Sequence, residues 1–295
     1  MVTLQLNPRS LISPLGIVRL FEIFLSCTAF SLVAVHHSYG GSYGAWSMFT
    51  WCFCFIVSIF VVVVEFVSLT HSLPLSWEDF TSAFSMLAAL MIFTTSIVYP
   101  SVFIPSYCSR SDCSYEGAAT AMSCLCFIAY AVEVGLTRAK VGEVSSFLAT
   151  VPGLMKVFEA YVACLIFSLV GNDLHYKAFA GLQWCLAVYC ICFIATLLIV
   201  ILTIGRCFAS LPCPAEKVLV GFNILAVLMY LTAAIIWPIY SFKNFARPSP
   251  CHSNNSTCVI WNSRLGVSFL TFFNLIAYIV DLVYSSKMVF LTVPA

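Results

Sequence analysis

A fourteen-residue segment occurs twice in this chain. Leu87–Pro100 reads LAALMIFTTSIVYP, and Leu225–Pro238 reads LAVLMYLTAAIIWP 138 residues later, with seven identical positions. Other residues recur at nearly the same spacing: Trp46, Cys52, Cys54, Phe55 and Pro74 return as Trp184, Cys190, Cys192, Phe193 and Pro212, and Arg19, Phe21, Glu22 and Cys27 return as Lys156, Phe158, Glu159 and Cys164. Near the end of each copy, IAYAVE (128–133) becomes IAYIVD (276–281). Four matches in one order indicate a duplicated unit.

Each copy contains four stretches that are long and apolar enough to cross a membrane. The chain is 62% hydrophobic and 8% charged, with a mean hydropathy of +1.02, whereas soluble proteins are about 25% charged. Because about 20 apolar residues span the hydrocarbon layer as a helix, we predict spans at 16–35, 46–68, 82–99, 117–137, 152–170, 183–204, 217–237 and 264–285. A net charge of +1 excludes binding of nucleic acid by bulk attraction.

The predicted fold is therefore an all-α integral membrane protein, with eight transmembrane helices in two tandem four-helix repeats. The repeats cover residues 16–137 and 152–287, separated by a linker at 138–151 and flanked by short tails at 1–15 and 288–295. Because four spans return the chain to its starting side, the two copies are expected to share one orientation, as parallel repeats do. No soluble domain is predicted.

The distribution of basic residues predicts which side of the membrane holds the termini. Eight of the thirteen Lys and Arg residues flank the side that carries both termini, and the positive-inside rule places such a side in the cytoplasm. Asn254 and Asn255 begin overlapping glycosylation sequons in the last loop of the opposite side. No secretory leader is recognised before the first span, which is expected to act as the insertion signal.

Five acidic residues fall within the predicted spans: Glu22, Glu65, Glu133, Glu159 and Asp281. A charge inside the bilayer costs about 3 kcal/mol even on the insertion scale. Arg19 with Glu22, and Lys156 with Glu159, are i,i+3 neighbours that share a helix face. We hypothesise that each pair meets the acid of its unit's fourth span, Glu133 or Asp281, in a polar clamp. The alternative is a proton or cation path. Replacing Glu22 with Gln is expected to impair folding or surface delivery.

Most of the fifteen cysteines lie within spans, where Cys packs as a small hydrophobe. Two pairs lie in loops of the opposite side, Cys108 with Cys113 and Cys251 with Cys258, and an oxidising compartment would favour two local disulfides, although four Cys allow three connectivities. Cys207 and Cys213 lie near a predicted cytoplasmic helix end, where either palmitoylation or an idle thiol fits. The sequence contains no hydrolase, zinc-protease or nucleotide-binding motif, and we predict no catalytic residue, metal site or cofactor.

An aromatic residue followed by proline ends the third span of each copy, as Tyr99–Pro100 and Trp237–Pro238. Proline breaks helices in their interior, and Tyr and Trp are enriched at membrane interfaces. We therefore expect these pairs to stop the helix and to anchor it at the interface. Trp46 and Trp184, at the start of the second span of each copy, are assigned the same anchoring role.

Several motifs together resemble the myeloid-associated differentiation marker family. They are WSMFTWCFCF (46–55), PLSW (74–77), ATVPGL (149–154), WCLAVY (184–189) and YIVDL (278–282), and the match covers nearly the whole chain. The resemblance implies two tandem MARVEL domains, a four-helix membrane module associated with cholesterol-rich membrane, vesicle trafficking and cortical organisation, with no catalytic residues to transfer. The amino-terminal tail is shorter than this family suggests.

The resemblance implies a non-enzymatic organiser of membrane domains in the plasma membrane and in trafficking vesicles. The expected partners are membrane lipids, including cholesterol-rich domains, and other membrane or cortical proteins, with homo- or hetero-association in the membrane and no nucleic acid. Two alternatives stay open. One is a transporter or channel that uses Glu22, Glu65, Glu133, Glu159 and Asp281, and the other is a junction or adhesion protein that uses the outer loop 241–263.

Overall fold

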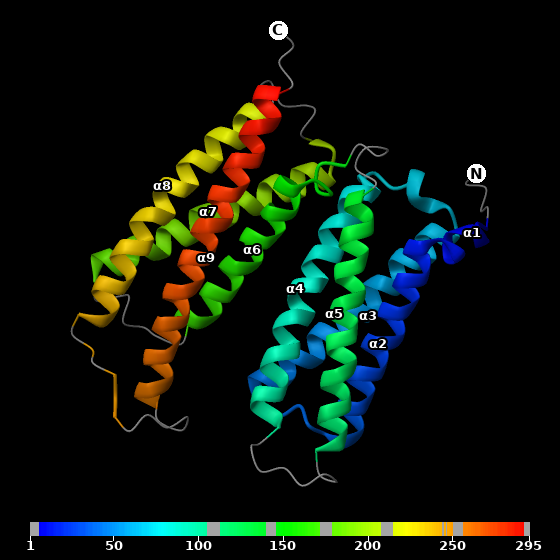
Figure 1. Ribbon diagram of the computed structural model, residues 1–295, viewed down its shortest axis with the longest axis horizontal. Coiled ribbons are helices and arrows are strands. Elements are labelled where there is room, and N and C mark those ends of the chain that lie inside the picture. Colours follow the sequence, from blue (N-terminus) through cyan, green and yellow to red (C-terminus); the bar gives the residue numbers. More distant parts are fainter. Residues whose placement is uncertain are drawn as a thin grey trace. The chain divides into compact units, whose positions relative to one another are not determined.

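The computed structural model describes residues 6–104, 113–139, 146–171, 179–207, 215–243, 245, 247–249 and 256–291. The chain divides into two compact units, Met1–Thr150 and Val151–Ala295, each a bundle of four long helices (Figure 1). The division falls inside the segment predicted as the linker, and the two units are described separately below.

The described secondary structure of both units is entirely helical. The first unit contains α1 (Pro8–Ile12), α2 (Pro14–His36), α3 (Gly41–Phe66), a short 3-10 helix (Leu69–His71), α4 (Trp77–Phe103) and α5 (Ser114–Ala139). The second contains α6 (Val151–Val170), α7 (Ala180–Ile204), α8 (Ala215–Phe242) and α9 (Ser256–Leu291). Eight helices of the described residues are long and apolar enough to cross a membrane, which confirms the predicted spans and fold class.

Local signals explain where the first helices of the bundle begin. Pro14 occupies the first turn of α2, where its missing N–H is not needed. The hydroxyl of Ser13 accepts a hydrogen bond from Gly16 N at 3.0 Å and caps the same helix. In the first turn of α4, Glu78 and Asp79 place negative charge at the positive end of the helix dipole. These short-range features set the register with which each apolar face enters the bundle.

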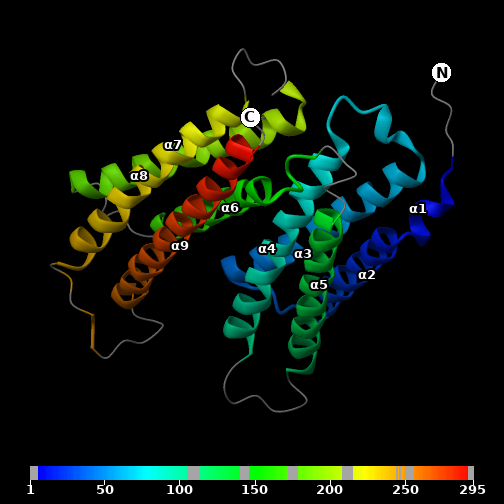
Figure 2. The ribbon, with the colours of Figure 1, turned by 45° about the horizontal axis from the view of Figure 1, so that its top comes forward.

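The four helices of each unit form a closed ring. In the first unit α2 and α4 each pack against both α3 and α5, and in the second unit α6 and α8 each pack against both α7 and α9 (Figure 2). Every long helix except α6 also turns large apolar side chains outward, among them Phe24, Ile56, Phe93, Ile128, Leu198, Leu228 and Phe273. In a lipid solvent such outward faces are the expected surface of the bundle.

Tyr99 and Trp237 are core residues, and the prediction that they anchor the protein at the interface is wrong. Both side chains are buried; Tyr99 Oη donates to Ser38 O at 3.2 Å, and Trp237 Nε1 donates to Arg264 O at 3.2 Å. The prediction of a helix stop is also wrong, because α4 and α8 continue beyond their prolines to Phe103 and Phe242. A proline removes one backbone hydrogen bond, but a helix can continue past it.

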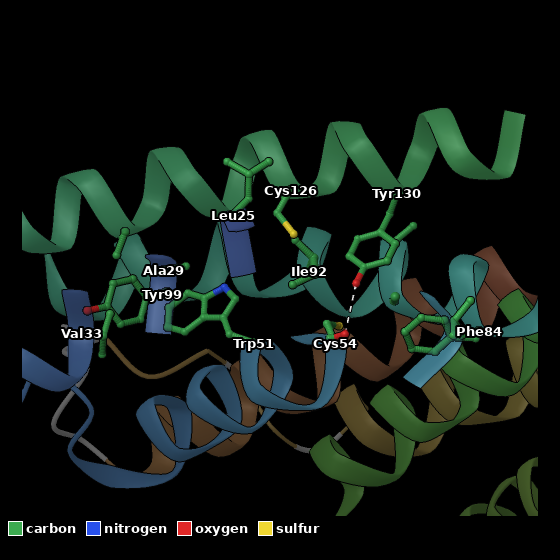
Figure 3. Packing of buried hydrophobic residues seen from close by; sticks show 14 of the residues in the cluster. Leu25, Ala29, Val33, Trp51, Cys54, Phe84, Ile92, Tyr99, Cys126 and Tyr130 are labelled. Carbon is green, nitrogen blue, oxygen red and sulfur yellow. Dashed lines mark hydrogen bonds between the residues drawn. The ribbon is translucent and has the colours of Figure 1, made fainter. Parts of the chain in front are cut away.

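Aromatic rings fill the centre of the first bundle (Figure 3). The rings of Trp51 and Tyr99 meet edge to face with centroids 5.1 Å apart, and Phe84 meets Tyr130 in the same way at 6.1 Å. Tyr130 Oη donates to the backbone carbonyl of Cys54 at 3.4 Å, the dashed line in Figure 3. The space between the helices is therefore occupied by side chains.

Gly44 lies where the loop before α3 passes close to that helix. A Cβ atom at this position would lie 2.3 Å from the backbone of Tyr39, which cannot move as a flexible side chain does. We expect Gly44→Ala to displace the loop and to lower the melting temperature of the purified protein. Gly135→Ala, where a Cβ meets nothing within 4 Å, is the control and is expected to melt at or above the wild-type temperature. Equal melting of the two variants would contradict this packing.

Candidate functional site

A buried arginine gathers carboxylates from two other helices in the first unit. Arg19 of α2 is 4% exposed. Its Nε donates to Glu133 Oε1 of α5 at 2.6 Å, and its Nη1 lies 2.5 Å from Glu65 Oε2 of α3. Trp77 Nε1 of α4 donates to the other oxygen of Glu65 at 3.1 Å. This repeat-one cluster (Arg19, Glu22, Glu65, Glu133, Trp77) therefore ties all four helices together near one end of the bundle.

Glu22 belongs to this cluster but does not pair as expected. Among the described ion pairs Arg19 is joined to Glu65 and Glu133 and not to Glu22, so the i,i+3 contact predicted within α2 is not an ion pair. The planar guanidinium group offers several N–H donors in a fixed fork, and the fork is directed across the bundle toward the two other helices. Glu22 is fully buried beside it.

A buried lysine occupies the equivalent place in the second unit. Lys156 of α6 is inaccessible to solvent; its Nζ lies 2.9 Å from Glu159 Oε2 and 2.7 Å from Asp281 Oδ2 of α9. It also donates to Asn223 Oδ1 of α8 at 2.6 Å, and it stands over the rings of Phe222 and Tyr278. In this repeat-two cluster (Lys156, Glu159, Asn223, Asp281) the i,i+3 pair and the acid of the fourth span do come together.

The two clusters share their cation and their fourth-span acid but differ in one partner. Glu65 of the first copy corresponds to Thr203 of the second, and Asn223 of the second copy corresponds to Ser85 of the first. The predicted clamp does not include Glu65 or Asn223, because neither residue has a counterpart of the same type in the other copy. Their positions in the sequence could have indicated that they belong to the clusters, because each lies in the part of its span nearest to the buried cation.

Two polar bridges join the second and fourth helices of each bundle. In the first unit Trp51 Nε1 donates to Ser123 Oγ at 3.0 Å, and Ser58 Oγ lies 2.8 Å from Tyr130 Oη. The second unit repeats the pattern with Tyr189 Oη 2.7 Å from Thr271 Oγ1, and Thr196 Oγ1 2.9 Å from Tyr278 Oη. Sequence reasoning missed these bridges, since each member alone reads as an ordinary residue of an apolar span.

We expect Tyr278→Phe to lower the free energy of unfolding by about 0.6 kcal/mol, the mean for hydrogen bonds between membrane helices. The ring would still pack, and only the hydrogen bond to Thr196 would be lost. A double-mutant cycle with Thr196→Val, followed by unfolding in mixed micelles, measures the coupling. Additive effects of the two substitutions would show that this bridge contributes nothing.

A smaller polar cluster closes the opposite end of the first bundle. His36 Nδ1 lies 2.8 Å from Glu116 Oε1, and the Ser38 hydroxyl donates to the same oxygen. The His36 ring stacks on Tyr115 with centroids 5.3 Å apart. The equivalent of Glu116 in the second unit is Arg264, whose Nη1 donates to Ser241 O at 3.3 Å. This end therefore carries opposite charges in the two copies.

The modification sites predicted from sequence are only partly covered by the structure. Cys113 and Cys258 are each disulfide-bonded, whereas Cys108, Cys251, Cys213, Asn254 and Asn255 lie outside the described residues. Cys207 is a free, exposed thiol at the end of α7. Within the described residues, no group of three or more His, Cys, Asp or Glu side chains could hold a metal ion.

One groove opens on the outward face of α4 and α5, with a volume of about 330 Å³. It is lined by Met86, Ala89, Leu90, Phe93, Phe127, Ala131 and Val134. The two alanines of this lining, Ala89 and Ala131, correspond to the larger residues Val227 and Ile279 in the second copy. The lining holds no titratable side chain, so the groove has no group that could act in acid–base or nucleophilic chemistry.

Comparison with protein families matches this arrangement of two four-helix units. The family model MARVEL, described as a membrane-associating domain, matches residues 10–136 and again residues 147–284. The chain belongs to the MARVEL family. The two matches coincide with the two bundles, which confirms that the structure is a tandem repeat of one membrane module. The family is a multi-pass membrane family, in agreement with the eight apolar helices.

Individual relatives match over nearly the whole chain. The chain is 43% identical to the myeloid-associated differentiation marker homolog of Xenopus laevis, over 97% of this chain and 96% of that protein. It is 42% identical to the human myeloid-associated differentiation marker (97% and 92%) and 42% identical to human myeloid-associated differentiation marker-like protein 2 (94% and 92%). These matches confirm the resemblance found in the sequence, and none of the names states an enzymatic activity. No solved structure matches the chain.

Proposed function

We propose that this MARVEL protein is a non-enzymatic organiser of lipid and protein domains in membranes, with a role in trafficking or cortical organisation. One observation carries the proposal: both bundles turn large apolar side chains outward on every long helix except α6, while the buried cations are paired with acids inside. What such a molecule offers its surroundings is an apolar surface of defined shape. Differences in how lipids and other helices pack on that surface are worth fractions of a kcal/mol per ångström of thickness mismatch, which is enough to sort membrane proteins.

We also propose a subcellular location and a set of binding partners for the protein. We place the protein in the plasma membrane and in trafficking vesicles, with both termini in the cytoplasm, because eight of thirteen basic residues flank the side of the termini. Its partners would be lipids of cholesterol-rich domains and other membrane or cortical proteins, including further copies of the chain. Helix association in lipid relies on close packing and on hydrogen bonds.

The test is partition of the tagged full chain between ordered and disordered phases of vesicles derived from plasma membrane, with proximity labelling in the same cells. Enrichment in one phase, with membrane or cortical proteins labelled, is the expected result. Reconstitution into liposomes tests the alternative of a transporter. Uniform partition, or a proton or cation flux that is lost when Glu22 and Glu159 are neutralised, would contradict an organising role.

A further inference from the structure

Glu22 has a buried carboxyl group that receives no hydrogen bond. The residue is inaccessible to solvent, and within the described residues neither of its side-chain oxygens has a hydrogen-bond donor. A buried carboxylate normally keeps its charge only where cations or N–H and O–H groups replace the lost water. Glu22 lacks these replacements although a cation is present in the same cluster.

In the repeat-one cluster, the hydrogen-bond donors Arg19 and Trp77 donate to Glu65 and Glu133 and not to Glu22. Arg19 is the one cation of this cluster, against the carboxyl groups of Glu22, Glu65 and Glu133. Arg19 donates to Glu133 at 2.6 Å and lies 2.5 Å from Glu65. Glu65 receives a further bond from Trp77. Arg19 pairs with the carboxylates of Glu133 and Glu65, and Glu22 is the acid of the cluster that has no ion-pair partner among the described residues.

The immediate neighbours of Glu22 offer an acceptor and no free donor. Its carboxyl group lies within hydrogen-bonding reach of Glu133. The Ser58 hydroxyl also lies near the Glu22 carboxyl group. Tyr130 Oη, 2.8 Å from Ser58 Oγ, donates its own hydrogen to Cys54 O, so the bond between the two hydroxyls uses the hydrogen of Ser58. Cys126 Sγ donates to the backbone oxygen of Glu22, not to its side chain. The titratable groups that face Glu22 from α2, α3 and α5 are Arg19, Cys54, Cys126, Tyr130 and Glu133, and Glu65 is connected to them through Arg19.

Two carboxyl groups can form a hydrogen bond with each other only if one of them carries a hydrogen. Glu133 already accepts a hydrogen bond from the Arg19 cation at 2.6 Å, which makes it the acceptor of this pair. The hydrogen therefore belongs to Glu22. A neutral Glu22 would donate to Glu133, which gives one of its two buried side-chain oxygens a hydrogen-bond partner.

We propose that Glu22 is a proton-binding site, which takes a proton from solvent and holds it at neutral pH as a hydrogen bond to Glu133. The site is built from α2 and α5 of the first bundle. Glutamine at position 22 has nearly the same shape as the protonated acid and can donate in the same direction. The expectation from sequence alone, that Glu22→Gln impairs folding, is thereby reversed: the variant is expected to fold and to reach the cell surface as the wild type does.

Infrared spectroscopy of the full chain in lipid nanodiscs tests the proposal. A protonated carboxylic acid has a C=O stretching band, separate from that of carboxylates, which shifts in heavy water. We expect wild-type protein at neutral pH to show such a band, with isotope-labelled glutamate identifying it as Glu. Glu22→Gln is expected to lose one component of this band. Glu78→Gln is the control and is expected to retain it, because Glu78 is an exposed glutamate in the first turn of α4 and lies outside the cluster.

Three results would overturn the assignment. The first is the absence of any protonated glutamate band in the wild type, which needs no variant. The second is a band that is unchanged in Glu22→Gln. The third is a Glu22→Gln protein that fails to fold, because a neutral isostere of the acid is expected to be accepted at a site that holds the neutral acid.

Discussion

Lys156→Met is expected to unfold the second bundle at a markedly lower temperature or detergent concentration than the wild type, with a loss of about 3–5 kcal/mol. Lys156 is inaccessible to solvent and is the cation that Glu159 and Asp281 share. Methionine fills much of the same volume but leaves both carboxyl groups, and the Asn223 amide oxygen, without the ammonium group. Unfolding of purified protein in mixed micelles and delivery to the cell surface are the two measurements.

A triple variant separates the loss of charge pairing from the loss of packing. Adding Glu159→Gln and Asp281→Asn to Lys156→Met removes the unpaired acids and keeps the shape of the site. Because neutral replacement of a whole buried ion-pair cluster is often tolerated, we expect the triple variant to regain most of the stability. If Lys156→Met alone melts as the wild type does, or if the triple variant is the least stable of the set, the cluster does not hold the bundle through charge.

Glu133→Gln is expected to produce the second large loss, again about 3–5 kcal/mol, in the first bundle. The substitution removes the carboxylate that Arg19 Nε contacts at 2.6 Å, and it leaves the guanidinium group with Glu65 as its remaining described ion-pair partner. Glutamine keeps one oxygen acceptor, so the loss reports the charge and not the hydrogen bond alone. Thermal unfolding of the purified protein is the measurement.

The matched control is Glu65→Gln. Glu65 contacts the same guanidinium group, but its side chain is 25% exposed, and solvent and headgroups can replace part of what is lost. We expect it to cost no more than about 1 kcal/mol, as partly exposed pairs do. A reversed order of the two variants would show that the buried position of Glu133 is not what makes its charge important.

Much of the fold could be predicted from the sequence because lipid imposes simple rules on length and polarity. The stretch 152–170 was predicted as a span, and α6 covers Val151–Val170. The repeat pattern located Arg19 and Lys156 as equivalent cations, because both stand three residues before a glutamate. Helix ends were less accurate: α9 runs from Ser256 to Leu291, beyond the predicted 264–285, since a helix does not stop where its apolar stretch stops.

The partners of each buried group could not be predicted in the same way. The partners depend on the direction in which each side chain extends from its helix. The guanidinium group of Arg19 extends toward Glu65 of α3, whereas the ammonium group of Lys156 extends toward Asn223 of α8. Hydropathy gives the depth of a residue in the membrane but not the angle at which its helix faces the centre. The same limit explains Tyr99, which composition and position placed at the interface and helix packing places in the core.

Each ion pair found among the described residues begins and ends within one bundle. Each bundle therefore supplies the acids that pair with its own buried cation. A gene that encoded one half alone would already bring the described acids that pair with its buried cation, and duplication of such a gene would require no new ion pair between the copies. Glu65 in the first copy corresponds to Thr203 in the second, and Ser85 corresponds to Asn223, so the two copies bury one cation in the membrane with different partners.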